Sequence, residues 1–83
     1  MARHLKLGKN TYAVARAEKT RNGFRHLATL FQDGMEIGQA KVTYLNRTWE
    51  RREFDTVLLK LVEDNTLLTE AEKKRYKKRI RGY

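Results

Sequence analysis

Few residues in this 83-residue chain could perform acid–base or metal chemistry. It has no cysteine and two histidines, His4 and His26, which are too few to complete a tetrahedral metal site. Glu50 and Glu53 lie beside several arginines, so intrahelical ion pairing explains them better than general acid catalysis does. The chain also lacks a glycine-rich phosphate loop and a Gly-x-Ser-x-Gly motif. We therefore expect no enzyme, no metal ion and no other cofactor.

Basic side chains are the chemistry that this sequence supplies in quantity. Lysine and arginine total 19 against 10 aspartate and glutamate residues, which gives a formal net charge of +9. Residues 1–25 hold seven basic residues and one acidic residue, and residues 73–83 hold seven basic residues and no acidic one. Charge gathered at both ends of a small domain steers polyanions toward it. We therefore expect nucleic acid as the partner, DNA in preference to RNA.

The first half of the chain alternates apolar and polar residues, which is typical of β-strands. Asn22-Gly23 and Asp33-Gly34 interrupt the alternation with residues that tolerate the positive φ of tight hairpin turns. We expect three antiparallel strands in a meander, at residues 11–20, 24–32 and 35–45. Residues 1–10 form either a flexible arm or a short extra strand.

The second half changes to the period of a helix. One helical face collects Phe54, Val57, Leu58, Leu61 and Val62. Asn46 or Thr48 is placed to cap this helix, and Asp64-Asn65-Thr66 ends it.

A capping box, Thr69-Glu70-Ala71-Glu72, opens a second helix at 69–81, which Gly82 is placed to end. Its apolar stripe is thin, with Leu68, Tyr76 and Ile80, so we expect it to pack by one edge. The predicted fold is therefore α+β, β-β-β-α-α, in a single domain over residues 1–83. Residues 11–64 make the sheet and first helix of this domain.

The two faces of the sheet follow from counting across the two turns. The bulkier face, with Tyr12, Val14, Leu27 and Phe31, is expected to receive the first helix. The other face has small residues and is expected to meet solvent, with Lys19, Arg21, His26 and Lys41 around Phe24. A one-residue bulge would exchange the faces, and an ordinary solvated surface, with its apolar residues covered by the last helix or the arm, is the alternative.

The expected nucleic-acid contacts combine this sheet face, the strand-to-helix connection and the C-terminal helix. They are Lys19, Arg21, Phe24, His26, Lys41, Arg47, Lys73, Lys74, Arg75, Lys77, Lys78, Arg79 and Arg81.

The stretch from Val42 to Leu58, VTYLNRTWERREFDTVL, resembles a segment of small uncharacterised proteins of bacterial phages and plasmids. In that group an Asn-Arg-Thr-Trp-Glu stretch follows a strand and precedes a helix with an aromatic residue and a Val-Leu pair. The resemblance covers 17 of the 83 residues and implies a bacterial mobile element but no activity. Trp49 fits a core role, and Arg47 either pairs with a carboxylate or contacts phosphate. By topology alone, three strands before a helix also look like plant AP2-type domains and the arm-binding domains of some phage integrases, which is no evidence of function.

We therefore predict a nucleic-acid-binding accessory protein of a bacterial mobile element. The alternatives are a protein-interaction module that docks on an acidic host partner and a structural subunit of a larger assembly. Apolar runs such as Val57-Leu58-Leu59 are far shorter than the ~18 to 20 residues of a membrane span, and the basic start is followed by no signal-peptide core. We expect a cytoplasmic protein without membrane contact, and the sequence does not fix the oligomeric state.

Overall fold

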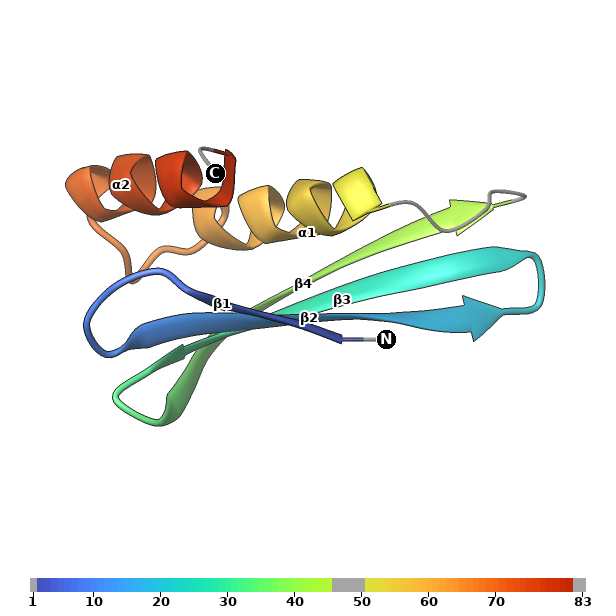
Figure 1. The fold of residues 1–83 in the computed structure, drawn as a ribbon, viewed down its shortest axis with the longest axis horizontal. Helices are drawn as coiled ribbons and strands as arrows, with labels where there is room; N and C mark the ends of the chain where they lie inside the picture. Colours follow the sequence, from blue (N-terminus) through green and yellow to red (C-terminus); the bar gives the residue numbers. More distant parts are fainter. Residues whose placement is uncertain (1, 46–50, 82–83) are drawn as a thin grey trace.

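Four antiparallel strands in chain order form one sheet, and two helices follow it (Figure 1). The structure is a computed structural model and describes residues 2–45 and 51–81. The strands are β1 (Ala2–Lys6), β2 (Thr11–Thr20), β3 (Gly23–Gln32) and β4 (Met35–Leu45), and the helices are α1 (Arg51–Glu63) and α2 (Glu70–Arg81). The α+β class and the meander are confirmed.

The sheet has four strands where the sequence predicted three. Residues 2–6 pair with β2, with Leu5 opposite Ala13, so the first of the two readings of the N-terminus, a flexible arm, is wrong. Arg3 forms an ion pair with Asp55 of α1, and Leu7 is buried in the core. The residues of β1, ARHLK, do not alternate strictly between apolar and polar, so the pattern alone does not identify a strand, and β1 is held by pairing with β2 and by these long-range contacts.

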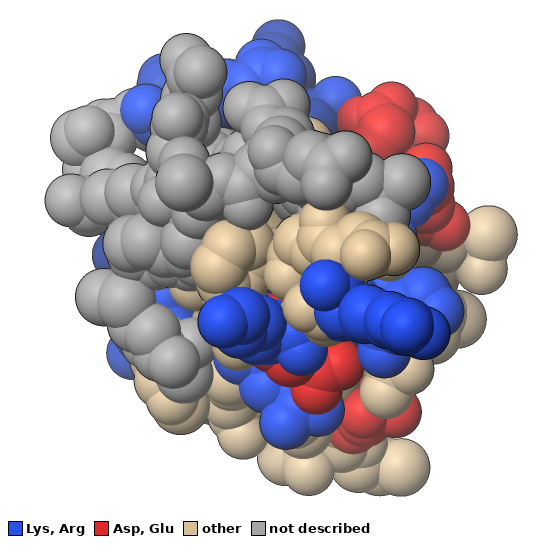
Figure 2. Space-filling view, turned by 90° about the vertical axis from the view of Figure 1, so that its right-hand side faces the viewer, with Lys and Arg blue, Asp and Glu red and all other residues tan. Residues whose placement is uncertain are grey.

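The two hairpin turns differ in how well the sequence located them. Asp33 and Gly34 have φ of 52° and 81° and connect the paired residues Gln32 and Met35, as predicted. The first turn consists of Arg21 and Asn22, one residue earlier than predicted, because Thr20 pairs with Gly23. The resulting register shift is two residues, so it leaves every side chain on its predicted face of the β2–β3 hairpin. Figure 2 looks onto the end of the molecule that carries this turn and shows Lys and Arg side chains gathered there.

A β-bulge in β4 changes the predicted register of that strand. Phe31 pairs with Glu36 and Leu30 pairs with Gly38, so Ile37 is the extra residue. From this point on, Ala40 and Val42 lie opposite Ala28 and His26. Lys41 therefore lies on the other face of the sheet from His26, whereas the sequence analysis put the two side chains on one face.

The prediction of which face is buried is wrong. Both helices lie on one side of the sheet (Figure 1), and Ala13, Ala15, His26, Ala28 and Leu30 beneath them are at most 1% exposed. We call this side the covered face. We call the other side the open face, and it consists of His4, Lys6, Tyr12, Val14, Arg16, Glu18, Arg25, Leu27, Thr29, Phe31, Glu36, Gln39, Lys41 and Thr43.

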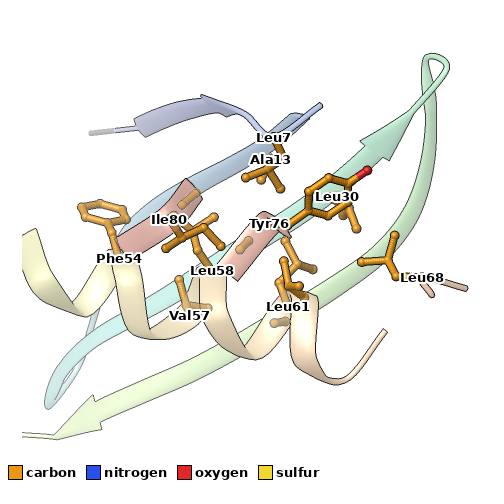
Figure 3. Packing of buried hydrophobic residues seen from close by; sticks show 14 residues of the cluster. Leu7, Ala13, Leu30, Phe54, Val57, Leu58, Leu61, Leu68, Tyr76 and Ile80 are labelled. Carbon is orange, nitrogen blue, oxygen red and sulfur yellow. The ribbon is translucent and has the colours of Figure 1, made fainter. Parts of the chain in front are cut away.

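The helices supply the large side chains of the core (Figure 3). The predicted face of α1 is confirmed, because its five apolar residues are each at most 2% exposed. Leu68 and two residues of α2, Tyr76 and Ile80, belong to the same buried cluster as Leu7. The second helix is thus part of the core. Among residues 2–45 and 51–81, no helix has the length and apolar character needed to cross a bilayer.

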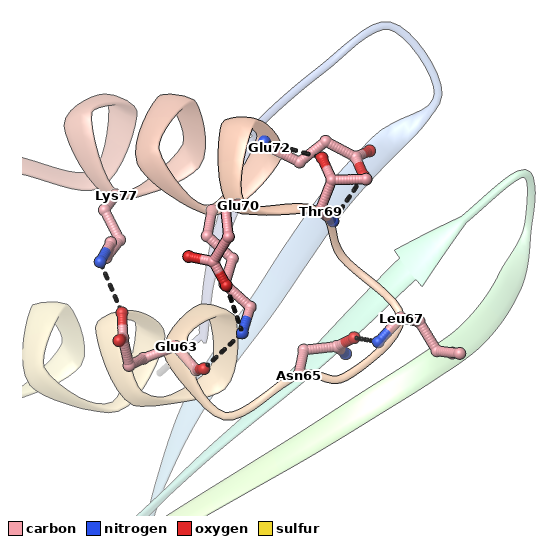
Figure 4. Close-up of polar contacts among 8 residues, drawn as sticks. Glu63, Asn65, Leu67, Thr69, Glu70, Glu72 and Lys77 are labelled. Atoms are coloured by element: carbon pink, nitrogen blue, oxygen red, sulfur yellow. Dashed lines mark hydrogen bonds and ion pairs between the residues drawn. The ribbon is translucent and has the colours of Figure 1, made fainter.

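The loop between the helices is fastened to the bulge in β4. Asn65 is buried and donates a hydrogen bond from Nδ2 to the Ile37 carbonyl oxygen (3.1 Å). Its Oδ1 accepts a second hydrogen bond, from the Leu67 amide (2.8 Å), which Figure 4 shows. A Cβ atom on Gly38 would lie 2.4 Å from Asn65 Nδ2, so any larger residue there would have to displace the Asn65 amide group. The predicted capping box is present, since the Glu72 amide donates to Thr69 Oγ1 (3.1 Å) and the Thr69 amide donates to Glu72 Oε1 (3.0 Å).

Candidate nucleic-acid interface

The structure separates the residues that the sequence analysis grouped on one sheet surface. His26 is 0% exposed, with its ring edge-on to Phe54 at a centroid distance of 5.0 Å, so it is a core residue and the prediction of a surface contact is wrong. Phe24 is half-buried on the covered side, while Lys19 and Arg21 are exposed at the β2–β3 end. Lys41 is exposed on the open face.

The predicted roles of four residues fall outside the part of the chain that the structure describes. They are Asn46 and Thr48 as helix caps, Arg47 as a phosphate contact and Trp49 as a core residue.

Three of the seven basic residues of the C-terminal helix hold the helix in place. Lys77 Nζ lies 2.5 Å from a carboxylate oxygen of Glu63, and Lys73 Nζ donates to the Glu63 carbonyl oxygen (3.0 Å) (Figure 4). The hydrogen bond from Lys77, supported by its charge, lowers the pKa of Glu63. Arg79 Nε donates to the carbonyl oxygen of Lys6 (3.1 Å), which joins α2 to β1. These cations bind the protein itself.

The other basic residues of α2 remain in solvent. Arg75 lies over the Tyr76 ring at 5.4 Å from its centroid. Lys74, Lys78 and Arg81 are exposed, and their spacing of four and three residues places them along one side of the helix. We call these three residues the α2 ridge. None of the three pairs with a carboxylate in the described part of the chain.

The open face carries an aromatic pair that the sequence analysis assigned to the core. The rings of Tyr12 and Phe31 stack at a centroid distance of 5.0 Å and an interplanar angle of 11°. Tyr12 is 39% exposed, so the pair is accessible from solvent. One signal in the sequence could have found it, namely that alanine recurs at positions 13, 15 and 17 of β2, while the larger Tyr12, Val14 and Arg16 occupy the alternate positions. Small residues on one face of a sheet leave room for the large side chains of a helix that packs against it.

Cations outnumber accessible carboxylates on the open face. Lys6, Arg16, Arg25 and Lys41 lie there, against two acidic residues in the described residues of that face. Both acidic residues are occupied, because Glu18 accepts from Arg25 Nη1 (3.3 Å) and Glu36 accepts from Gln39 Nε2 (3.0 Å). The face therefore carries a net positive charge. Its ion pair between Arg25 and Glu18 is exposed to solvent and contributes little to the stability of the fold.

A hollow of about 790 Å³ lies beside Tyr12, where the β1–β2 loop meets the β3–β4 turn. The two loops are joined by a hydrogen bond from the Asp33 amide to the Asn10 carbonyl oxygen (2.9 Å). The lining brings cationic, aromatic and amide groups together: His4, Leu5, Lys6, Gly8, Lys9, Asn10, Thr11, Tyr12, Asp33 and Gly34. Within residues 2–45 and 51–81, no three His, Asp or Glu side chains gather in a way that would hold a metal ion.

Comparisons with protein families, curated proteins and solved structures found no match for this chain. The resemblance to phage and plasmid proteins stays a prediction.

Proposed function

We propose that this chain is a nucleic-acid-binding accessory protein of a bacterial mobile element, and that it binds through the open face of its sheet. The observation that carries the proposal is the stacked Tyr12–Phe31 pair. It is accessible to solvent, on a face whose two carboxylates already accept hydrogen bonds from Arg25 and Gln39. Aromatic rings and unoccupied cations on one surface are the groups that nucleic acids need, for bases and phosphates respectively.

The electrostatics of the whole chain supports the same partner. A net charge of +9 on 83 residues attracts any polyanion and raises its rate of association. Arg16 and Lys41 flank Leu27 in one row across the open face, because Leu27 pairs with both. These two cations, on the strands to either side of β3, are available there to phosphate groups, and the aromatic pair lies four residues further along β2 and β3.

The α2 ridge contributes to this function from a different side. α2 lies on the covered side of the sheet (Figure 1), so a short strand bound to the open face does not contact Lys74, Lys78 and Arg81 directly. Their role in the proposal is to add to the long-range field, and the effect of removing them should fall with added salt.

A charge-reversal experiment tests the proposal. Arg16→Glu with Lys41→Glu changes the open face, and Lys74→Glu with Lys78→Glu makes the same charge change on the α2 ridge. Fluorescence anisotropy with labelled DNA and RNA at about 50 mM and 200 mM salt should show binding that falls steeply with salt. The open-face variant should lose most of its affinity and the ridge variant much less, while both keep the wild-type melting temperature within a few degrees.

Two outcomes would contradict the proposal. The first is no binding at micromolar protein at about 50 mM salt. The second is an open-face variant that binds as well as the wild type while the ridge variant does not.

The exposed ridge favours the alternative predicted from the sequence, docking on an acidic protein. Poly-glutamate that competes as well as DNA at equal charge concentration, and only with an intact ridge, would support that alternative.

A further inference from the structure

We propose that the hollow beside Tyr12 receives one unpaired base and its phosphate, so that the protein prefers single-stranded nucleic acid to duplex. The inference rests on the proposed function above and specifies the form of nucleic acid that the open face binds. It is carried by the orientation of the Tyr12 ring, by the cations around the hollow and by the way the two loops are joined.

The Tyr12 ring has one face to offer. Its other face is covered by Phe31 of β3, at 5.0 Å and nearly parallel. On the opposite side of Tyr12 the neighbouring strand is β1, and the residue paired with Tyr12 is Lys6. Both residues line the hollow, and Tyr12 is 39% exposed, so Tyr12 is accessible from this space. The stack with Phe31 also fixes the Tyr12 rotamer, and this reduces the entropy that binding would cost.

The same hollow is lined by two lysines and one aspartate. Lys6 and Lys9 line the hollow and are exposed. Arg79 of α2 donates to the carbonyl oxygen of Lys6, and within residues 2–45 and 51–81 no carboxylate forms an ion pair with the Lys6 ammonium group. A phosphate next to a stacked base is within reach of flexible lysine side chains of this kind. The arrangement suits a nucleotide and does not suit an uncharged aromatic ligand.

The hollow is formed before any ligand binds. The hydrogen bond between Asp33 and Asn10 joins its two loops, and the Asp33-Gly34 turn is fixed by its positive φ values. The volume of about 790 Å³ lies within the range of small-molecule sites. Asn10 and Asp33 offer an amide and a carboxylate, which are suitable partners for the hydrogen-bonding edge of a base.

A base inside a duplex cannot enter this site. It is stacked on both sides and its hydrogen-bonding edge is paired, so it would first have to leave the helix. Bases of a single strand are free to stack on a protein aromatic ring, and such stacking tolerates any base. The same Lys6 and Lys9 would still attract the phosphates of a duplex, but without the contribution of the ring.

The test compares four ligands of equal length on the full chain. They are oligo(dT), oligo(rU), a DNA duplex and an abasic DNA strand, which has the phosphates of a single strand and no bases. Binding is measured by competition in fluorescence anisotropy at one salt concentration. We expect oligo(dT) or oligo(rU) to bind more tightly than both the abasic strand and the duplex.

Variants separate the ring from the charge. Tyr12→Ala should weaken binding of the base-bearing single strand by about 5- to 150-fold and leave the abasic strand and the duplex unchanged. Tyr12→Phe keeps the ring and should bind as the wild type does. Lys6→Gln with Lys9→Gln should weaken all four ligands, because it removes phosphate contacts. Leu67→Ala, at an exposed apolar residue of the loop between the helices and away from the hollow, is the control for Tyr12→Ala and should leave all four affinities unchanged.

Failure of this inference differs from failure of the proposed function. An abasic strand that binds as tightly as oligo(dT), or a Tyr12→Ala variant that weakens all ligands equally while its melting temperature is unchanged, overturns the base site. The proposed function survives in both cases. If none of the four ligands binds at micromolar protein, both proposals fail. A concentration-dependent dimer that Tyr12→Ala abolishes in light scattering would show that a second copy of the chain occupies this face, and it also overturns the base site.

Discussion

The two faces of the sheet differ in the size of their side chains, and the face with the smaller ones is the buried one. Alanine occupies positions 13, 15, 28 and 40 of the covered face, and Gly38 lies there too. The open face has Tyr12, Val14, Leu27 and Phe31. Apolar bulk on a sheet therefore did not decide which face is covered. The covering helices bring Phe54, Leu58, Tyr76 and Ile80, and small residues opposite them allow close packing at the density of a protein interior.

The same difference decides which basic residues can meet a ligand. A face chosen by bulk puts Lys19 and His26 at the expected binding surface and places Tyr12 in the core. The actual choice buries His26, exposes Tyr12 and leaves Arg16 and Lys41 on the open side. In a sheet of this size, an error about which face is buried therefore also gives the wrong candidate binding residues.

The largest expected effect tests the comparison within one strand. Leu30 and Leu27 belong to β3 and lie on the covered and the open face respectively. Leu30→Ala should lower the free energy of unfolding by about 2 to 5 kcal/mol, because it leaves a cavity under the helices. Leu27→Ala should lower it by about 1 kcal/mol or less. Urea denaturation measures both, and equal losses would mean that the covered face is assigned wrongly.

A second prediction concerns the small residues themselves. Ala15 is 0% exposed beneath the helices, so Ala15→Leu should lower the free energy of unfolding by about 1 to 3 kcal/mol through overpacking. Val14→Leu, one residue away on the open face, is the control and should change it by about 0.5 kcal/mol or less. A fully stable Ala15→Leu protein in thermal or urea unfolding would show that the sheet and the helices leave room between them.

The third prediction concerns the close contact between Gly38 of the covered face and Asn65. A methyl group on Gly38 collides with Asn65 Nδ2, so Gly38→Ala should disturb the hydrogen bond from Asn65 to Ile37 and cost about 1 kcal/mol. In an Asn65→Ala background the same change should cost clearly less, because the obstacle is gone. A double-mutant cycle in urea measures this coupling. Additive effects would mean that the loop and the bulge are not fastened in this way.

The smallest expected effect concerns the charges that hold α2 over the covered face. Contact with Lys77 lowers the folded-state pKa of Glu63 from its ordinary value of 4.5. The carboxylate therefore stabilises the folded protein at pH values above its ordinary pKa, and this contribution is lost as the pH falls through the lowered pKa. Glu63→Gln should lower the melting temperature slightly at pH 7 and not at all at acid pH.

Two lysine variants control this last measurement. Lys77→Gln removes the partner of Glu63 and should reproduce the loss at neutral pH, whereas Lys78→Gln changes an exposed neighbour and should not. A loss in Glu63→Gln that is the same at pH 7 and at acid pH would show that the residue acts through packing and not through its charge.

The local structure of this protein could be predicted from its amino-acid sequence. The Asp33-Gly34 turn, the apolar face of α1 and the Thr69–Glu72 capping box were all predicted correctly, because each depends on φ, period or hydrogen bonds within a few residues. The exposure of Lys41 and of the α2 ridge also agrees with the prediction, and their binding roles stay predictions.

The fourth strand, the bulge and the choice of buried face depend on contacts between residues that are far apart in the sequence. β1 is held by Arg3 and Leu7, whose partners lie far along the chain, and the bulge at Ile37 is fastened by Asn65, 28 residues away. The two faces of the sheet are nearly equal in local preference, so the volume of side chains from α1 and α2 chooses between them. Because α2 packs beside α1 and β1, Lys73, Lys77 and Arg79 bind groups of the protein itself. The distribution of charge in the sequence does not reveal these contacts.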